Sequence, residues 1–441
     1  MARTLGGTRR QAMSRPILVV SLLSQNPTSA KERTATDGEV VFEREAAGEP
    51  VARRTRSRRR AAALGRLPEE ILAWEILVRL PARDILRCRV VCCSWLRLAS
   101  TPDFLLAHHR RQPSLPLAEL YSAASTNTEA SLPILKCPPI LRFNDYYNYH
   151  GSKLQASCDG LLLLRRFGGR FTICNPGTRQ CAPLQGLIAE GRINILAVYL
   201  HQPSNEYRVL YWKGRHRDKE IACYILTVWQ RGSPRCIGVP SSNPAIEKAM
   251  MTGDGQTPFN VSPPIVFGNC LHWEPGWLYY DVSGIVVFDT VIESFRSMGC
   301  PPGATSCCTR LCDMDGLIGF SCFDDGRTAA KIWLLKDYKK VLWSLKYHVK
   351  FPVETLCRRI DTKHFILSHK GDVLVYNISA CYMFHCDSTG KLLEEFDWKH
   401  RPQGWRVIGY RLKESLLQHK FFARGGAPCA DNQVFFQTVL N

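Results

Sequence analysis

The sequence lacks the features that would assign it to several common classes of protein. No run of about 18 or more apolar residues occurs, so no segment is predicted to cross a bilayer as a helix. The motifs of phosphate-binding loops, dinucleotide-binding turns, serine-hydrolase elbows and zinc-protease helices are absent. No two cysteines have the C-x-x-C spacing of structural zinc sites. The sequence therefore predicts no catalytic residues, no cofactor and no bound metal.

Cysteine itself is abundant, with 19 residues scattered along the chain. An odd number without a convincing secretory signal favours free thiols in a reducing compartment. We therefore expect the protein in the nucleus, the cytoplasm or both, and no association with a membrane.

Length and charge indicate how the chain is organised. At 441 residues, with 45% hydrophobic residues, it is expected to form two folded units and a tail. The net charge is +19, and residues 1–63 hold 13 Lys and Arg against 6 acids. We interpret residues 1–63 as a disordered basic tail, although an organellar transit peptide or a nuclear-localisation patch would share this composition. Its densest cluster is Arg53, Arg54, Arg56, Arg58, Arg59 and Arg60.

The segment 64–112 has the hydrophobic pattern of a small helical module. A first helix is predicted from Leu67 to Leu80, with Pro68 at its start and Pro81 after its end. A second is predicted from Ala82 to about Val91, and a third, short one carries Trp95 and Leu98. Three helices of this length bury too little apolar area to be secure alone, so their apolar stripe is a candidate docking surface.

The order L-P-x-x-I-L, I-L-x-R-L-P, D-I-L-R-C-R-V-V-C, S-W and D-F in this segment resembles the F-box of large plant receptor families. The resemblance implies binding to the Skp-type adaptor of cullin-RING ubiquitin ligases, and through it to cullin. Cys93 departs from the pattern, since many members have Lys there. The adaptor contacts that the resemblance implies are Leu67, Pro68, Ile71, Ile76, Leu77, Leu80, Pro81, Leu86, Val90, Val91 and Trp95. Replacing both Leu77 and Leu80 with Ala is expected to weaken the complex.

From residue 115 to about 435, short apolar runs alternate with turn residues, which predicts β-structure. A strand that ends in Asn or Asp recurs about every 40 to 60 residues, the spacing of β-propeller blades. A distorted β-sandwich or barrel would also fit. The copies are Phe171–Pro176, Gly284–Thr290, Ile332–Asp337 and Val373–Asn377, with a fainter one at Cys223–Thr227.

Three stretches in this region, Ser157–Leu162, Asn269–Trp273 and Ile332–Tyr338, resemble the F-box-associated domain. The resemblance implies a propeller-like domain that recruits protein substrates. The expected fold class is α+β multidomain, a three-helix F-box followed by a mainly β, propeller-like domain at residues 115–435.

The function expected from these observations is substrate recognition in a Skp-cullin-F-box type ubiquitin ligase, for a protein target that the sequence does not identify. Two alternatives from other classes remain open, a propeller-based enzyme and a basic nucleic-acid-binding protein drawn by the +19 charge. Neither accounts for residues 64–104, and we do not expect nucleic acid as a partner.

Overall fold

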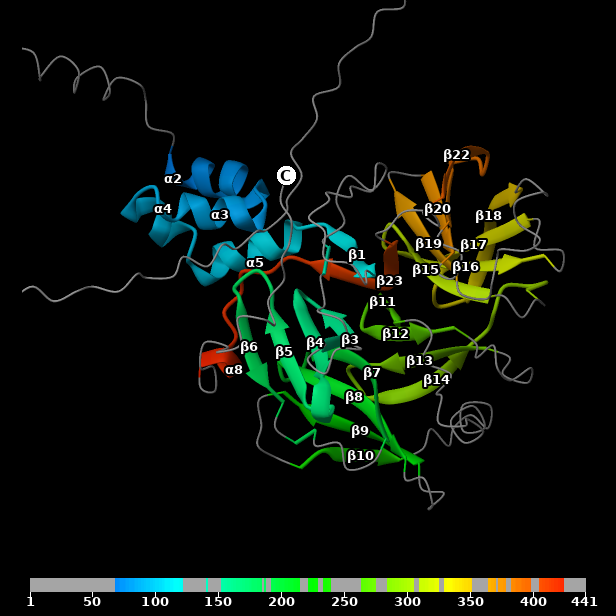
Figure 1. Cartoon of the computed structure of the whole chain (residues 1–441), viewed down its shortest axis with the longest axis horizontal. Helices are drawn as coiled ribbons and strands as arrows, with labels where there is room; N and C mark the ends of the chain where they lie inside the picture. The colour runs from blue at the N-terminus through cyan, green and yellow to red at the C-terminus, as the bar shows by residue number, and fades with distance from the viewer. Residues whose placement is uncertain are drawn as a thin grey trace, which may run out of the picture. The chain divides into compact units, whose positions relative to one another are not determined.

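The computed structural model describes a helical unit up to Arg111 and a β-rich unit from Gln112 onward (Figure 1). Two of the expectations above, the basic tail at 1–63 and the contact Leu67, lie outside the described residues. Within these residues, no helix is long and apolar enough to cross a membrane. The described residues are 68–121, 140–141, 152–184, 186–187, 192–214, 221–228, 233–238, 263–274, 284–304, 309–324, 329–350, 364–369, 372–377, 382–397 and 404–423.

The helical unit contains the three predicted helices and a fourth one that the sequence analysis did not separate. The first predicted helix comprises α2 (Glu69–Ile71), the π-helical segment η1 (Leu72–Ile76) and the 3-10 segment η2 (Leu77–Arg79). The others are α3 (Ala82–Cys88), α4 (Cys93–Leu98) and α5 (Pro102–Arg111).

The start of α5 has a clear cause in the sequence. Pro102 lies at its first position and Asp103 in its first turn, both of which favour a helix start. The backbone N–H of Phe104 donates to Oγ1 of Thr101 at 3.4 Å, which caps the helix. Farther along, Nε2 of His108 hydrogen-bonds the carbonyl oxygen of Leu80 at 2.8 Å. Because α5 closes the core of the unit, the three-helix expectation underestimated the module.

The core of the helical unit is small and is formed mainly by η1, η2, α3 and α5. Phe104 is fully buried at its centre, where its ring centroid lies 6.2 Å from that of Trp74. The other buried apolar residues are Ala73, Leu77, Val78, Ala82, Ile85, Ala99 and Leu105.

The β-rich unit has the expected propeller-like architecture. Its described residues form five four-stranded antiparallel sheets, in each of which neighbouring strands follow one another in the chain, and one three-stranded sheet (Figure 1). The first sheet holds β3 (Ser152–Cys158), β4 (Leu161–Arg166), β5 (Phe171–Asn175) and β6 (Gln180–Pro183). The second holds β7 (Arg192–His201), β8 (Glu206–Gly214), β9 (Ile221–Thr227) and β10 (Arg235–Gly238). The third holds β11 (Ile265–Phe267), β12 (Cys270–Trp273), β13 (Ile285–Asp289) and β14 (Ser294–Met298).

The remaining sheets complete the unit. The fourth holds β15 (Thr309–Met314), β16 (Leu317–Phe323), β17 (Ala329–Asp337) and β18 (Leu342–Lys350). The fifth holds β19 (His364–His369), β20 (Asp372–Asn377), β21 (Tyr382–Cys386) and β22 (Leu392–Asp397). The three-stranded sheet has the order β2 (Ile140–Leu141), β1 (Ser114–Tyr121), β23 (Gly404–Lys413), and the short helix α8 (Lys420–Ala423) follows.

The predicted repeat coincides with the third strand of the first four sheets, namely β5, β9, β13 and β17. Asn175, Asp289 and Asp337 each accept backbone N–H groups of the following turn, which folds the chain back into the fourth strand. The copy assigned to Val373–Asn377 was wrong, because it is the second strand of its sheet. The corresponding third strand there is β21, followed by Asp387, which accepts from the N–H of Thr389 at 2.8 Å.

Apolar side chains fill the spaces between successive sheets. Four buried clusters join the first sheet with the second, the second with the third, the third with the fourth and the fourth with the fifth, and another joins the three-stranded sheet with the first. The first strands lie innermost, with β3 beside β7 and β15 beside both β11 and β19. This radial order is that of a propeller.

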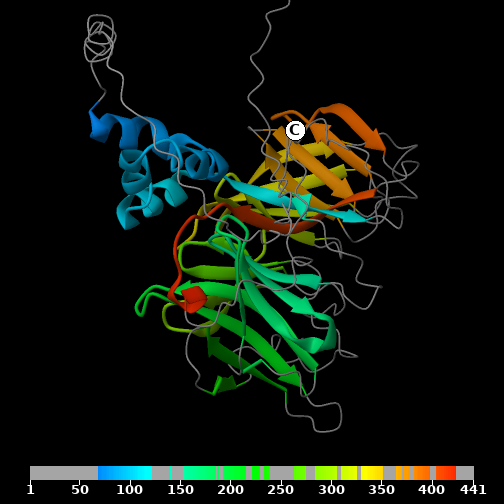
Figure 2. The ribbon, with the colours of Figure 1, turned by 60° about the vertical axis from the view of Figure 1, so that its left-hand side comes forward.

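The two ends of the β-rich unit close on one another. β1 pairs antiparallel with β23, from Ser114 opposite Lys413 to Tyr121 opposite Gly404 (Figure 2). Beyond β23 the chain packs tightly on the first sheet, since a Cβ on Gly160 would lie 2.5 Å from Cβ of Ser415. Residues that are almost 300 positions apart therefore share one ladder, and the propeller depends on both ends of the chain.

Candidate functional site

The outer surface of the helical unit is unusually apolar for a module of its size. Val90 is 86% exposed and Val91 is 64% exposed, and both lie between α3 and α4. The other large apolar side chains on this surface are 39% to 47% exposed and comprise Ile71, Trp74, Ile76, Leu86, Leu96 and Leu106. Large apolar side chains exposed in this number on a small unit are typical of an interaction surface.

Two side-chain contacts hold segments of the helical unit together. Ser94 at the start of α4 donates its hydroxyl to a carboxylate oxygen of Glu69 at the start of α2, at 2.8 Å. The guanidinium of Arg89 donates to the carbonyl oxygen of Ala99 from Nε at 3.2 Å and from Nη2 at 2.8 Å. The connection that carries Val90 is thus held against the end of α4.

The residues expected to contact the adaptor occupy different environments. Leu80, Pro81 and Trp95 are half-buried, and Leu77 is only 1% exposed. Those that lie on the surface are Pro68, Ile71, Ile76, Leu86, Val90 and Val91. Leu77 must therefore be corrected from surface contact to core residue, because periodicity alone does not distinguish an apolar core face from an apolar partner face. Trp74, Leu96 and Leu106 belong to the exposed set but were not selected from the sequence.

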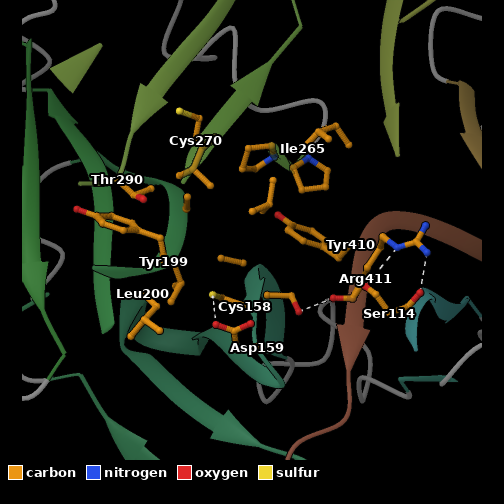
Figure 3. A pocket seen from close by; sticks show the side chains of 18 of the residues that line it. Ser114, Cys158, Asp159, Tyr199, Leu200, Ile265, Cys270, Thr290, Tyr410 and Arg411 are labelled. Carbon is orange, nitrogen blue, oxygen red and sulfur yellow. Dashed lines mark hydrogen bonds between the residues drawn. The ribbon is translucent and has the colours of Figure 1, made fainter. Parts of the chain in front are cut away.

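A second candidate site is a cleft of about 480 Å³ among the inner strands of the propeller (Figure 3). Its lining comes from β1, β3, β7, β11, β12, β15 and β23, so segments from both ends of the unit meet there. Side chains that line it include Ser114, Cys158, Asp159, Tyr199, Leu200, Ile265, Cys270, Thr290, Tyr410 and Arg411. No sequence pattern indicated these residues as a site, because strands from distant positions assemble the cleft.

Hydrogen bonds hold the walls of the cleft. Tyr410 on β23 donates its hydroxyl to the carbonyl oxygen of Gln155 on β3 at 2.7 Å. Arg411 donates to the carbonyl oxygen of Ser114 at 2.6 Å and pairs with Asp313 at 3.3 Å. These contacts join β1, β3, β15 and β23 and give the cleft a fixed polar rim on one side.

Three titratable groups of the cleft, Cys158, Tyr199 and Tyr410, have raised pKa values that favour their neutral forms. Burial, followed by the nearby charge of Asp159, holds the pKa of the Cys158 thiol well above its ordinary value. Burial raises the pKa of Tyr410, and burial together with Glu293 raises the pKa of Tyr199. A thiol that stays protonated is a poor nucleophile. Nowhere in the described part of the chain do three His, Cys, Asp or Glu residues come together as a metal site.

The tryptophans of the propeller whose side chains are described do not mark an interaction surface. The four tryptophans of the propeller whose side chains are described are buried between sheets, and they are Trp212, Trp273, Trp333 and Trp343. His272 is also fully buried, with Nδ1 3.1 Å from the carbonyl oxygen of Ile265 and Nε2 2.8 Å from the hydroxyl of Tyr338. These four tryptophans and His272 therefore pack in the interior of the propeller.

The combination of a β-propeller and a helical unit with an apolar outer surface defines a class of interaction proteins built for docking. Comparison with known protein families identifies the family within this class. The F-box associated beta propeller domain matches residues 141–403, more than half of the chain, and an F-box-like model matches residues 64–112. The chain belongs to the F-box associated beta propeller family and is an F-box protein.

Similar proteins of Arabidopsis thaliana agree with this assignment. An F-box protein is 27% identical over 36% of this chain and 51% of its own length, and a second is 29% identical over 34% and 41%. An F-box/LRR-repeat protein is 24% identical over 70% of this chain and 74% of its own length. The matched part thus spans about half or less of the first two relatives.

Proposed function

We propose that this protein is the substrate-recognition subunit of a Skp-cullin-F-box type ubiquitin ligase in a plant cell, acting in the nucleus or cytoplasm. The observation that carries the proposal is the apolar outer surface of the helical unit, with Val90 and Val91 at 86% and 64% exposure. A Skp-type adaptor would cover this surface and link the chain to cullin. The match of residues 64–112 to an F-box-like model supports the same partner.

The proposed mechanism is positional. The helical unit would hold the adaptor and the propeller would hold a protein target, so that lysines of the target stay near a ubiquitin-charged enzyme supplied by other subunits. This arrangement would raise the effective concentration of the target's lysines at that enzyme. The chain itself would contribute no reacting group.

We further propose that a segment of the target enters the cleft among the inner strands. The rim offers Arg411 and Asp313 for polar contacts, while Pro264, Ile265 and Val266 form an apolar lip on which Val266 is 65% exposed. Such a mixture of apolar area and a few fixed polar groups is typical of peptide-sized sites.

An exchange of the propeller tests the proposal. We expect a chimera that keeps residues 1–114 but carries another receptor's domain in place of residues 115–435 to bind the adaptor as before. The set of proteins ubiquitinated in reconstituted reactions should change with the propeller. Continued ubiquitination of the original targets by the chimera would contradict the assignment of recognition to this domain.

A further inference from the structure

Two cysteines face one another across the outer hairpin of the first sheet. Cys174 on β5 lies directly opposite Cys181 on β6, and both are thiols in this structure. Sγ of Cys181 donates a hydrogen bond to Sγ of Cys174 at 2.7 Å. In the described part of the chain, no other strand pairing places two cysteines opposite each other.

The hydrogen-bond pattern of the hairpin shows which kind of pair this is. The N–H of Leu184 donates to the carbonyl oxygen of Phe171 at 3.0 Å, so that opposing pair is hydrogen-bonded. Because such pairs alternate in an antiparallel ladder, Cys174 and Cys181 form a non-hydrogen-bonded pair. Pro183, which has no N–H, occupies the other non-hydrogen-bonded position, as this pattern requires.

This position brings the two backbones within bonding reach. Cα atoms of non-hydrogen-bonded pairs lie about 4.5 Å apart. Disulfides span about 4.4 to 6.8 Å between Cα atoms, so the pair sits at the short end of the permitted range. A bond formed there would be strained, and strained disulfides are more readily reduced.

We propose that Cys174 and Cys181 are a reversible disulfide site, oxidised by hydrogen peroxide and reduced by cellular thiols. Cys181 is 8% exposed and Cys174 fully buried, so the peroxide reaches Cys181 first. The Cys181 sulfur attacks one peroxide oxygen, the O–O bond breaks, and a sulfenic acid and one water form. The Cys174 sulfur then attacks this sulfenic sulfur, the S–O bond breaks, and a second water leaves. The two thiols lose two electrons and the peroxide gains them.

The position of the pair gives the bond a structural consequence. Both cysteines belong to the buried cluster that contains Leu117 of β1 and Leu412 of β23, the two strands that close the propeller. A disulfide there would link β5 to β6 next to the sheet that contains β1 and β23. Oxidation should therefore stabilise the part of the propeller on which closure depends.

Peptide mapping tests the proposal on the full chain. Trypsin cleaves after Arg170, Arg179 and Arg192, which places the two cysteines on separate peptides, Phe171–Arg179 and Gln180–Arg192. After treatment with hydrogen peroxide and alkylation, we expect these peptides to be recovered joined, and separate again after reduction with dithiothreitol. The melting temperature should rise by a few degrees on oxidation and fall back on reduction.

Two variants make the result specific. Cys181→Ala should abolish the joined peptides and the shift in melting temperature, whereas Cys312→Ser, a buried control in another sheet, should retain both. The exposed Cys236 reports that peroxide has modified the protein. If Cys236 is oxidised while Phe171–Arg179 and Gln180–Arg192 are recovered separately, with their thiols alkylated or overoxidised, the proposal is wrong.

Discussion

The two units of this protein treat apolar side chains in opposite ways. Among the described residues, the helical unit exposes eight large apolar side chains and the far larger β-rich unit exposes six. In the propeller, apolar residues lie between successive sheets, so that each buried cluster is covered by one sheet on either side. The helical unit has one small core and an apolar exterior.

This contrast indicates where each unit obtains its stability. The propeller buries its own apolar surface and needs its two ends, β1 and β23, to do so. The helical unit leaves much of its apolar surface exposed, so a modest loss inside its core should matter more. The predictions below test this contrast.

Leu77→Ala should have the largest effect. It removes a buried side chain at a cost of about 3 to 5 kcal/mol, which is comparable with all the stability that a module of this size possesses. We expect residues 68–111 to become sensitive to limited proteolysis while the propeller stays resistant. The matched change Ile332→Ala, at a fully buried position of β17, should leave the propeller folded. Equal protease resistance of wild-type and Leu77→Ala protein would contradict the small-core account.

Glu274→Gln should destabilise the propeller by roughly 3 kcal/mol. The carboxylate of Glu274 pairs with Nη1 of Arg310 at 2.8 Å, and both side chains are buried. Removing one partner leaves a buried charge without its counter-ion. Denaturant titration of the full chain, followed in both units, measures the loss, and Glu75→Gln, which breaks the exposed pair with Arg79 in the helical unit, is the control expected to cost under about 1 kcal/mol. Equal effects of the two changes would refute the role of burial.

His272 should make the propeller less stable in mild acid. Burial lowers its pKa from 6.5 to about 4, so the folded protein favours the neutral ring. The stability that this provides is complete above about pH 6.5 and is lost as the pH falls toward 4. Between about pH 7.5 and pH 5 the loss should be about 2 kcal/mol. Denaturant unfolding at both pH values should show a smaller difference for His272→Gln than for wild type, and an unchanged difference would exclude His272 as the cause.

Surface substitutions should have the smallest effect on stability. Val91→Ser in the helical unit and Leu393→Ser in the propeller replace side chains that are 64% and 52% exposed. Each should change the free energy of unfolding by less than about 0.5 kcal/mol. A larger loss for Val91→Ser, measured by thermal unfolding of the full chain, would show that Val91 packs within its own unit.

Much of the fold followed from the sequence because its signals are local. Pro68 and Pro81 delimit the first helix, and Asn175, Asp289 and Asp337 mark the turn after the third strand of three sheets. The predicted repeat was assigned to the wrong strand of the fifth sheet because Asn377 also ends an apolar strand. Only the order of pairing shows that the turn residue of the repeat there is Asp387.

The sites followed from the sequence less well, for physical reasons. Leu77 and Ile76 are adjacent and equally apolar, yet one is 1% exposed and the other 41%, because tertiary packing decides which faces inward. At the cleft, Arg411 donates a hydrogen bond to Ser114 although 297 positions separate them in the sequence, and no local sequence pattern predicts that contact. The cross-strand cysteine pair likewise depends on the register of β5 and β6.

The affinity of the full chain for a purified Skp-type adaptor tests the central claim most directly. Isothermal titration should show binding by wild-type protein and a loss of at least about 2 kcal/mol, roughly 30-fold, for the double variant Val90→Glu and Val91→Glu. Leu393→Glu, an exposed leucine of the propeller, should bind like wild type. The thermal unfolding of all three proteins should coincide. Unchanged affinity of the folded double variant would show that the apolar surface of the helical unit is not the adaptor site.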